Sequence, residues 1–231
     1  MPAPATPSAL VVAHRGAWGP APPNSIGAFE RAIELGCDAI ELDVRATAEG
    51  RLAVVHDARV GGRAVRRLTL GELRARMPGR QAPLLEEVLE LAAGRIALDV
   101  ELKESGCCAA RAAAIVARRL APDRYVITSF SAGALIAASA VAPEARTGLL
   151  LAPGLRRREL DGRVRRAGAA FVAPHVSLVR RGILDWSAAR GLDAWLWTVN
   201  DERTLRCLGG DARVRALITD RPERALARRI P

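Results

Sequence analysis

The sequence has few aromatic residues and almost no lysine. Aromatic side chains make up 3% of the 231 residues, and Lys103 is the single lysine among 35 basic side chains. So few aromatic rings leave few platforms on which single-stranded bases could stack, and no nucleic-acid-binding motif accompanies the net charge of +10. The scattered arginines therefore indicate a solvated basic surface, and we expect no nucleic-acid partner.

The sequence also has no segment suited to cross a membrane and no cysteine pattern typical of disulfides or metal sites. No apolar run reaches the roughly 18 residues of a membrane span, and the opening MPAPATPSA has neither a basic start nor an apolar stretch. The four cysteines form no CxxC pair and no metal-ligand spacing. We expect a cytoplasmic protein in a reducing compartment, with no stable membrane insertion, and the oligomeric state is left open.

Nothing in the sequence divides the chain. It contains no internal repeat and no linker rich in Pro, Gly or Ser, so we expect a single domain over residues 1–231. Short β-rich runs alternate with helical patterns, which is typical of an α/β protein built from βα units around a parallel sheet. The expected strands are Leu10–His14, Ala39–Val44, Leu52–His56, Ile96–Leu102, Val126–Phe130, Thr147–Leu151, Ala170–Ala173, Ala194–Val199 and Ala216–Thr219.

Nine strands are one more than a (β/α)8 TIM barrel contains. The second and third expected strands are separated by only a short segment, which allows a tight antiparallel turn but not a parallel crossover. We therefore predict eight parallel barrel strands and an additional antiparallel hairpin strand after the second one. A turn at Glu49 and Gly50 would place Asp43 opposite His56.

The C-terminal ends of barrel strands line the active site of this fold, and two of them carry paired ionisable residues. Glu41 and Asp43 alternate with apolar residues on one strand, and Glu101 and Lys103 do so on another. Three converging carboxylates without cysteine predict a site for a divalent cation, Mg²⁺ or Ca²⁺. The alternatives are that these acids form a buried charge network with Arg15 and Lys103, or that the strands are shorter and the acids are solvated.

Two of the three histidines follow strands beside these acids. His14 and His56 could divide the proton transfers of phosphodiester hydrolysis, one taking and one giving a proton. Arg15 offers a planar fork of donors to a phosphate, and the single lysine offers a point charge. Asp57 either orients His56 or is a turn residue. His175 has no acidic neighbours in the sequence and is interpreted as structural.

Seven short blocks spread over nearly the whole chain resemble the glycerophosphodiester phosphodiesterase family. These blocks are AHRG at Ala13–Gly16, NS-x-x-AF at Asn24–Phe29, AIELDV at Ala39–Val44, VVHD at Val54–Asp57, VELK at Val100–Lys103, WTVN at Trp197–Asn200 and ITDRP at Ile218–Pro222. Each block alone is weak, but their order and spacing are specific. The resemblance implies cleavage of a small-molecule glycerophosphodiester to sn-glycerol 3-phosphate and an alcohol.

The resemblance also implies roles for individual residues. The site residues it implies are His14 and His56 as the acid/base pair, Glu41, Asp43 and Glu101 as metal ligands, and Arg15 and Lys103 as residues that bind the phosphate. Trp197, at the end of another expected strand, is also predicted to bind the substrate. Two features depart from the family pattern. Pro23 replaces a glutamate that the family usually has before the asparagine, and the Arg-Thr-Thr that commonly follows the HD block is absent.

Two other functions are kept as alternatives. The first is a phosphodiesterase like lysophospholipase D or sphingomyelinase D, for which Trp197, Trp18 or Phe130 could supply an apolar rim. The second is a non-catalytic barrel that binds nucleic acid or anionic surfaces through its positive charge. The sequence also leaves open whether water or the glycerol hydroxyl of the substrate attacks the phosphorus.

Overall fold

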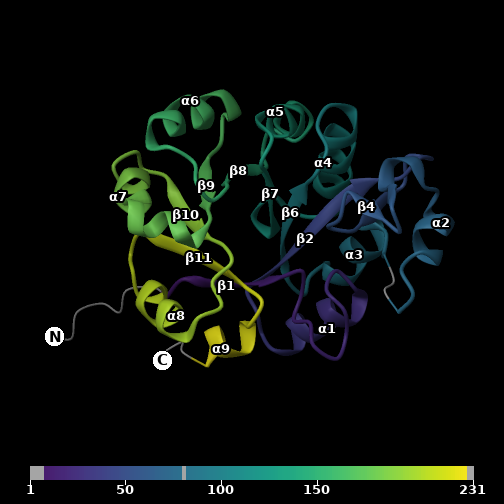
Figure 1. The fold of residues 1–231 in the computed structure, drawn as a ribbon, viewed down its shortest axis with the longest axis horizontal. Coiled ribbons are helices and arrows are strands. Elements are labelled where there is room, and N and C mark those ends of the chain that lie inside the picture. The colour runs from purple at the N-terminus through teal and green to yellow at the C-terminus, as the bar shows by residue number, and fades with distance from the viewer. Residues whose placement is uncertain (1–7, 80–81, 228–231) are drawn as a thin grey trace.

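Eight parallel strands close into a barrel in the computed structural model, which describes residues 8–79 and 82–227 (Figure 1). The strands around the ring are β1 (Leu10–His14), β2 (Ala39–Ala46), β6 (Ala97–Leu102), β7 (Tyr125–Ser129), β8 (Arg146–Leu151), β9 (Phe171–Pro174), β10 (Asp193–Leu196) and β11 (Val214–Thr219). The ring closes because β1 pairs with both β11 and β2. The predicted TIM barrel is confirmed.

Helices surround this ring on the outside (Figure 1). The α-helices of the described ranges are α1 (Ile26–Glu34), α2 (Leu70–Ala75), α3 (Leu85–Ala92), α4 (Cys107–Arg119), α5 (Ala132–Val141), α6 (Arg157–Ala167), α7 (Ile183–Ala188), α8 (Glu202–Gly209) and α9 (Pro222–Leu226), and the 3-10 helices are η1 (Val65–Arg67), η2 (Pro122–Arg124) and η3 (Val176–Arg181). Local capping starts several of them. Ser25 caps α1 by accepting the Ala28 N–H, and Thr69 and Glu72 form a capping box at the start of α2. Within residues 8–79 and 82–227, no helix has both the length and the apolar character of a membrane span.

The additional strand is β3 (Leu52–Val54), and it pairs antiparallel with the second half of β2. β2 therefore has two partners along one edge, because β1 covers Ala39 to Glu41 and β3 covers Val44 to Ala46. The predicted hairpin is confirmed, but its register was wrong by one residue. Val55, not His56, lies opposite Asp43 and donates its N–H to the Asp43 carbonyl at 2.9 Å.

The segment after the hairpin is more ordered than the sequence indicates. The sequence shows no regular pattern over residues 57–68, yet β4 (Arg59–Val60) and β5 (Arg63–Ala64) form a small antiparallel sheet there. This sheet packs over its own apolar cluster, which includes Val60, Val65 and Leu68. A two-residue strand is too short to show period-two alternation, so the formation of β4 and β5 depends on tertiary packing and cannot be predicted from the sequence pattern.

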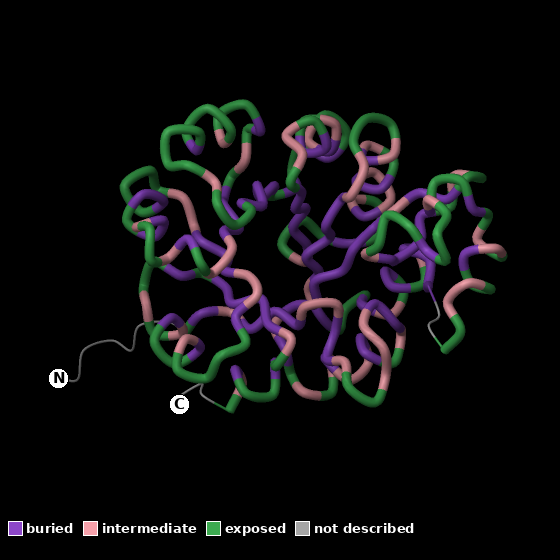
Figure 2. Tube along the Cα trace, in the orientation of Figure 1, coloured by how far each residue is buried: buried purple, intermediate pink, exposed green. Residues whose placement is uncertain are grey.

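Two layers of apolar side chains fill the molecule on either side of the strands, and Figure 2 shows the buried residues running along the ring. The outer layer lies between the strands and the helices. The inner layer fills the barrel and includes Phe171, Trp195 and Ile218. The ring of Phe171 leaves no space above Gly148 on the neighbouring strand, since a Cβ atom there would lie 2.2 Å from the ring.

Replacement of Gly148 by alanine is therefore expected to destabilise the barrel by about 1–3 kcal/mol, the usual cost of overpacking a filled core. Gly71→Ala is the control, because a Cβ atom at Gly71 meets nothing within 4 Å. Thermal unfolding followed by circular dichroism would measure both variants. Equal midpoints for Gly148→Ala and the parent protein would show that Phe171 can move aside freely.

Candidate active site

The turn after β1 positions His14 and Arg15. Arg15 has a φ of 58°, in the left-handed region that few non-glycine residues adopt, and Gly16 follows with a φ of 84°. A Cβ atom on Gly16 would lie 2.7 Å from the backbone of Ala28, so the turn packs directly against α1. Unfavourable backbone conformations held in place by packing are common at functional sites.

His14 is oriented by Asp220, which directly follows β11. Its Nδ1 lies 2.6 Å from Oδ1 of Asp220, and Nδ2 of Asn200 donates to the other carboxylate oxygen at 2.6 Å. Burial alone would raise the pKa of Asp220, but the hydrogen bond with His14 and the nearby charges outweigh burial and lower that pKa. An ionised Asp220 favours the proton on Nδ1 of His14, which leaves Nε2 for the site.

Strand register brings three carboxylates together beside His14. His14 lies opposite Glu41 in the pairing of β1 with β2, and Asp43 lies opposite Glu101 in the pairing of β2 with β6. One oxygen of each of the three acids lies within 4.8 Å of the others. The three residues are 4%, 0% and 7% exposed, respectively. The predicted acidic cluster therefore exists, and it is buried.

Two cationic side chains contact the cluster. Arg15 donates its backbone N–H to Glu41 Oε2 at 3.0 Å, and its Nε lies 3.0 Å from Asp43 Oδ2. Lys103 Nζ lies 2.7 Å from Asp43 Oδ1 and 2.5 Å from Glu101 Oε1. The charge network considered for these residues is thus present around Asp43 and Glu101. Among the described residues, Glu41 has no Arg or Lys side chain within ion-pair distance; Nε2 of His14 lies 3.8 Å away.

The pKa shifts of the three acids indicate that Arg15 and Lys103 together do not supply enough positive charge to keep all three ionised. Burial, followed by the charges of Asp43 and Glu101, raises the pKa of Glu41 well above its ordinary value. Burial also raises the pKa of Glu101 to about 7, although Lys103 opposes this. Only at Asp43 do Lys103 and Arg15 outweigh burial and lower the pKa to about 2. Further positive charge is needed to ionise all three near neutral pH.

The residues present fit a divalent cation. All three donors are carboxylates, the ligands that hard cations such as Mg²⁺ and Ca²⁺ prefer. The buried oxygens Oδ1 of Asp43 and Oε1 of Glu101 lie close to Lys103, but their contacts lack the angles of a hydrogen bond. Buried acceptors without directed donors are costly, and a bound cation would satisfy them.

His56 follows the hairpin strand β3 and faces the same site. Its Nδ1 lies 2.9 Å from Oδ1 of Asp57, and the side chain is 43% exposed. Burial lowers the pKa of His56, and the hydrogen bond with Asp57 opposes that shift. Asp57 is therefore in position to orient His56, as one of the two interpretations of the sequence holds. Each histidine turns Nδ1 toward an aspartate, which leaves both Nε2 atoms for reacting groups.

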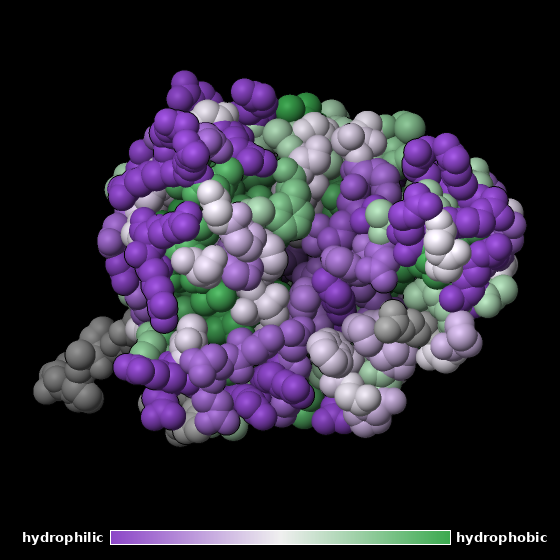
Figure 3. All heavy atoms as spheres, viewed as in Figure 1, coloured by the Kyte–Doolittle hydropathy of each residue, from purple (hydrophilic) through white to green (hydrophobic). Residues whose placement is uncertain are grey.

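A cavity of about 230 Å³ brings most of these residues together. Its lining residues are His14, Arg15, Glu41, His56, Asp99, Glu101, Lys103, Thr128, Phe130, Leu150, Trp197 and Ile218. Every predicted site residue except Asp43 lines it. Asp43 has a fully buried side chain and ion pairs with Arg15 and Lys103, which both line the cavity. In Figure 3 this face of the molecule is hollowed near its centre.

Trp197 forms part of the cavity wall. Its Nε1 donates to the carbonyl of Ala173 at 2.6 Å, and its ring meets Phe130 edge-on at a centroid distance of 5.5 Å. The third histidine, His175, does not line this cavity. It caps η3 by accepting the N–H of Ser177, and its ring contacts Trp197 from outside the cavity lining.

Several residues of the site were given no role from the sequence. Asp220 and Asn200 hold His14, and Asn24 donates to Oδ2 of Asp43 at 2.7 Å. Asp99 accepts a 2.6 Å hydrogen bond from Thr128, and burial raises the pKa of Asp99 to about 7. The alternation of β6 was a usable signal, because Asp99 stands two residues before Glu101 and so faces the same side.

Comparison with known proteins assigns the chain to a family. The family model for "Glycerophosphoryl diester phosphodiesterase family" matches residues 14–224. The chain belongs to this family. A glycerophosphodiester phosphodiesterase of Caldanaerobacter subterraneus subsp. tengcongensis is 31% identical over 234 residues, which cover 93% of this chain and 95% of that protein. The resemblance drawn from the sequence blocks is confirmed, and membership of the family makes this chain a phosphodiesterase.

Solved structures show the same fold. A glycerophosphodiester phosphodiesterase from Parabacteroides distasonis superposes with a TM-score of 0.79 at 26% identity, covering 96% of this chain and 97% of the other. An Oleispira antarctica phosphodiesterase in complex with the product sn-glycerol-3-phosphate has a TM-score of 0.81 at 23% identity, with 96% of each chain covered. The second likeness supports the fold of this phosphodiesterase.

The two departures from the family pattern lie close to His56. Pro23, which stands in place of the usual glutamate, lines a small cavity of about 50 Å³ together with Asn24, His56 and Asp57. The chain without Arg-Thr-Thr continues from Asp57 into the small sheet of β4 and β5. Both differences therefore change the surroundings of one histidine and leave the carboxylate cluster intact.

The raised pKa of Glu101 predicts how the stability of the metal-free phosphodiesterase depends on pH. A folded-state pKa of about 7, above the ordinary 4.5, means that the contribution is fully present below about pH 4.5 and is lost as pH rises through 7. Glu101 should therefore contribute a fall of roughly 2 kcal/mol in stability in EDTA between pH 5 and pH 8, and the raised pKa values of Asp99 and Glu41 should add to it. Thermal unfolding would measure it.

Glu101→Gln should make this fall shallower without abolishing it, because the raised pKa values of Asp99 and Glu41 also contribute, whereas Glu90→Gln, at an exposed position of α3, should leave the fall unchanged. If the cluster holds a cation, Mg²⁺ or Ca²⁺ should raise the unfolding temperature of the parent protein more at pH 8 than at pH 5, because ionised carboxylates bind a cation more tightly than protonated ones. An equally steep fall in Glu101→Gln would contradict the assignment.

Proposed function

We propose that this chain, as one barrel domain over residues 1–231, is a metal-dependent phosphodiesterase that hydrolyses glycerophosphodiesters to sn-glycerol 3-phosphate and an alcohol. The observation that carries the proposal is the single cavity lined by two histidines, two cationic side chains and buried carboxylates. Family membership supports the class of reaction. The Oleispira antarctica phosphodiesterase, which shares the fold, holds sn-glycerol-3-phosphate as its product.

Glu41, Asp43 and Glu101 would hold the divalent cation, Mg²⁺ or Ca²⁺. When bound, such a cation stabilises the negative charge that develops on the phosphoryl oxygens, an effect worth several kcal/mol. The protein contributes a rigid, buried set of oxygen donors at the ends of two neighbouring strands. Because the carboxylates repel one another without positive charge, the site favours binding of a doubly charged ion.

Arg15 and Lys103 would bind the phosphate of the substrate. Both side chains line the cavity, and in the structure both form ion pairs with the acids of the cluster. Arg15 offers a planar fork that matches two phosphate oxygens, whereas Lys103 offers one compact charge. Trp197 would form the wall against which the substrate lies, because its ring is fixed by the hydrogen bond to Ala173.

His14 and His56 would transfer the protons. Both expose Nε2 because Nδ1 of each faces an aspartate, Asp220 for His14 and Asp57 for His56. One imidazole takes the proton of the attacking hydroxyl or water, and the other gives a proton to the leaving oxygen. Burial lowers the pKa of His56, which favours its neutral form near pH 7.

A second candidate function keeps the same chemistry with a lipid substrate. Phe130 is a large aromatic residue that remains 38% exposed, and it contacts Trp197 at the cavity wall. Such an aromatic rim could take the acyl chain of a lysophospholipid, as in a lysophospholipase D. Comparing glycerophosphocholine with lysophosphatidylcholine as substrates would distinguish the two functions.

His14→Ala and His56→Ala should each lower kcat by about 10²–10⁴, the usual contribution of general acid–base catalysis. His175→Asn is the matched control, because it replaces the remaining histidine and keeps a side chain that can cap η3. It should retain near-parental activity. Steady-state kinetics with glycerophosphocholine would measure all three, and near-parental rates in both alanine variants would remove these histidines from the mechanism.

The purified protein should release sn-glycerol 3-phosphate from at least one of glycerophosphocholine, glycerophosphoethanolamine and glycerophosphoglycerol. EDTA should abolish the release, and added Mg²⁺ or Ca²⁺ should restore it, because the carboxylate cluster offers the oxygen ligands that such ions prefer. A coupled assay for glycerol 3-phosphate gives the rates. Full activity in EDTA after exhaustive dialysis would contradict metal dependence.

A further inference from the structure

A second and larger cavity adjoins the candidate active site. Its volume is about 510 Å³, and it lies between α6 and the segment that joins β7 to α5. The residues that line it are Phe130, Ala132, Leu149, Arg158, Glu159, Gly162, Arg163 and Arg166. Phe130 lines both this cavity and the active-site cavity, so the two cavities share its ring as a wall.

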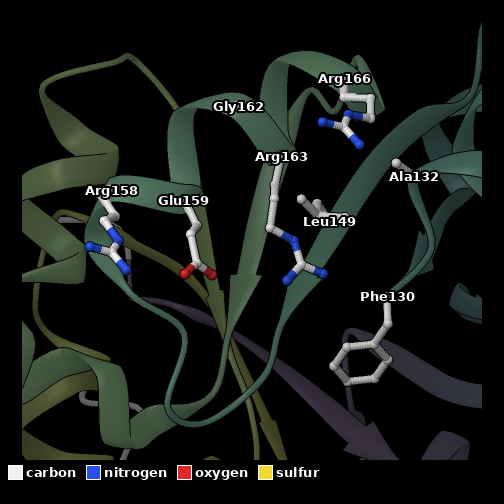
Figure 4. A pocket seen from close by; sticks show the side chains of 8 residues that line it. All are labelled: Phe130, Ala132, Leu149, Arg158, Glu159, Gly162, Arg163 and Arg166. Atoms are coloured by element: carbon white, nitrogen blue, oxygen red, sulfur yellow. The ribbon is translucent and has the colours of Figure 1, made fainter.

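The second cavity is strongly basic. Three of its side chains are arginines of α6, Arg158, Arg163 and Arg166, against the single acid Glu159 (Figure 4). Across residues 8–79 and 82–227, none of these arginines lies within ion-pair distance of a carboxylate. The nearby acid Asp161 is already held by Arg190 at 2.6 Å. The cavity therefore offers positive charge that the protein itself does not neutralise.

Figure 4 shows how these groups are arranged. Arg163 and Arg166 extend from α6 beside Leu149, Phe130 lies beyond the end of Arg163, and Arg158 lies on the other side of Glu159. In Figure 3, hydrophilic atoms gather over the region of α6, with hydrophobic atoms between them and the central hollow. An apolar partition thus separates the arginines of α6 from Arg15 and Lys103.

The two basic groups are suited to two different anions. Arg15 and Lys103 already serve the carboxylates and the phosphate of the reaction, and they lie on the other side of Phe130. The arginines of α6 are therefore placed for an anionic group distant from the scissile bond. The glycerol part of a glycerophosphodiester carries only hydroxyl groups, so this second anion must belong to the other alcohol of the substrate.

We propose that Arg158, Arg163 and Arg166 form a subsite for a leaving alcohol that carries a second phosphate group. The inference rests on the proposed function, because it needs a phosphodiester in the first cavity. Hydrolysis then breaks one P–O bond. Water supplies a hydroxyl to the phosphorus and a proton to the leaving oxygen, and the alcohol departs with its own phosphate intact.

Two soluble substrates test this subsite, because they differ only in the leaving group. Glycerophosphoglycerol loses a neutral glycerol, whereas bis(glycerophospho)glycerol loses a glycerol that still bears a phosphodiester. After correction for its two equivalent bonds, the second substrate should have a kcat/KM about tenfold higher at low salt. The preference should shrink as added NaCl screens the exposed arginines.

Arg163→Gln combined with Arg166→Gln should lower kcat/KM for bis(glycerophospho)glycerol about tenfold and leave that for glycerophosphoglycerol within about twofold. The matched control is Arg157→Gln with Arg165→Gln, which removes the same charge from the same helix but not from this cavity. The control should retain the preference. Circular dichroism would verify that both double variants fold.

The outcomes separate the subsite from the proposed function. Equal kcat/KM for the two substrates in the parent protein, or the same loss of preference in both double variants, would overturn the subsite while the phosphodiesterase function stands. Hydrolysis of neither substrate, together with no release of glycerol 3-phosphate from the other glycerophosphodiesters, would overturn both.

Discussion

The burial of three carboxylates side by side at the mouth of the barrel is the constraint on which the rest of the site depends. Glu41, Asp43 and Glu101 cannot all be ionised in a low-dielectric environment without positive charge close to them. The structure supplies that charge from Arg15 and Lys103, but only at Asp43 do these two cations outweigh burial and lower the pKa. The remaining deficit of positive charge is one that a bound divalent ion would offset.

The length of β2 explains why two histidines share this site. β1 stops at His14, opposite Glu41, and the antiparallel strand β3 takes its place along the rest of β2. The ends of β1 and β3 therefore both lie near the carboxylates of β2. His14 is the last residue of the first partner, β1, and His56 comes two residues after the second partner, β3. Because both strands pair with β2, both imidazoles lie near the carboxylates of that strand.

The positive charge of the chain is distributed in functionally different ways. Arg15 and Lys103 are largely buried, pair with acids and line the cavity of the candidate active site. Many exposed arginines instead pair with surface acids, as Arg95 does with Glu30, and such pairs contribute little stability. The arginines of α6 that line the second cavity form a separate group, because they form no ion pair with any acid in the described part of the chain.

The sequence by itself determined the barrel, the extra hairpin strand and which acids and histidines stand at strand ends, because period-two alternation and strand ends are local properties of the chain. It did not determine the hairpin register, which was one residue off, since several turns satisfy the same pattern. Only the tertiary structure brought Asp220 to His14 across 206 positions of sequence, and only it placed α6 beside Phe130. Contacts that depend on ring closure between the first and last strands leave no periodic signal in the sequence.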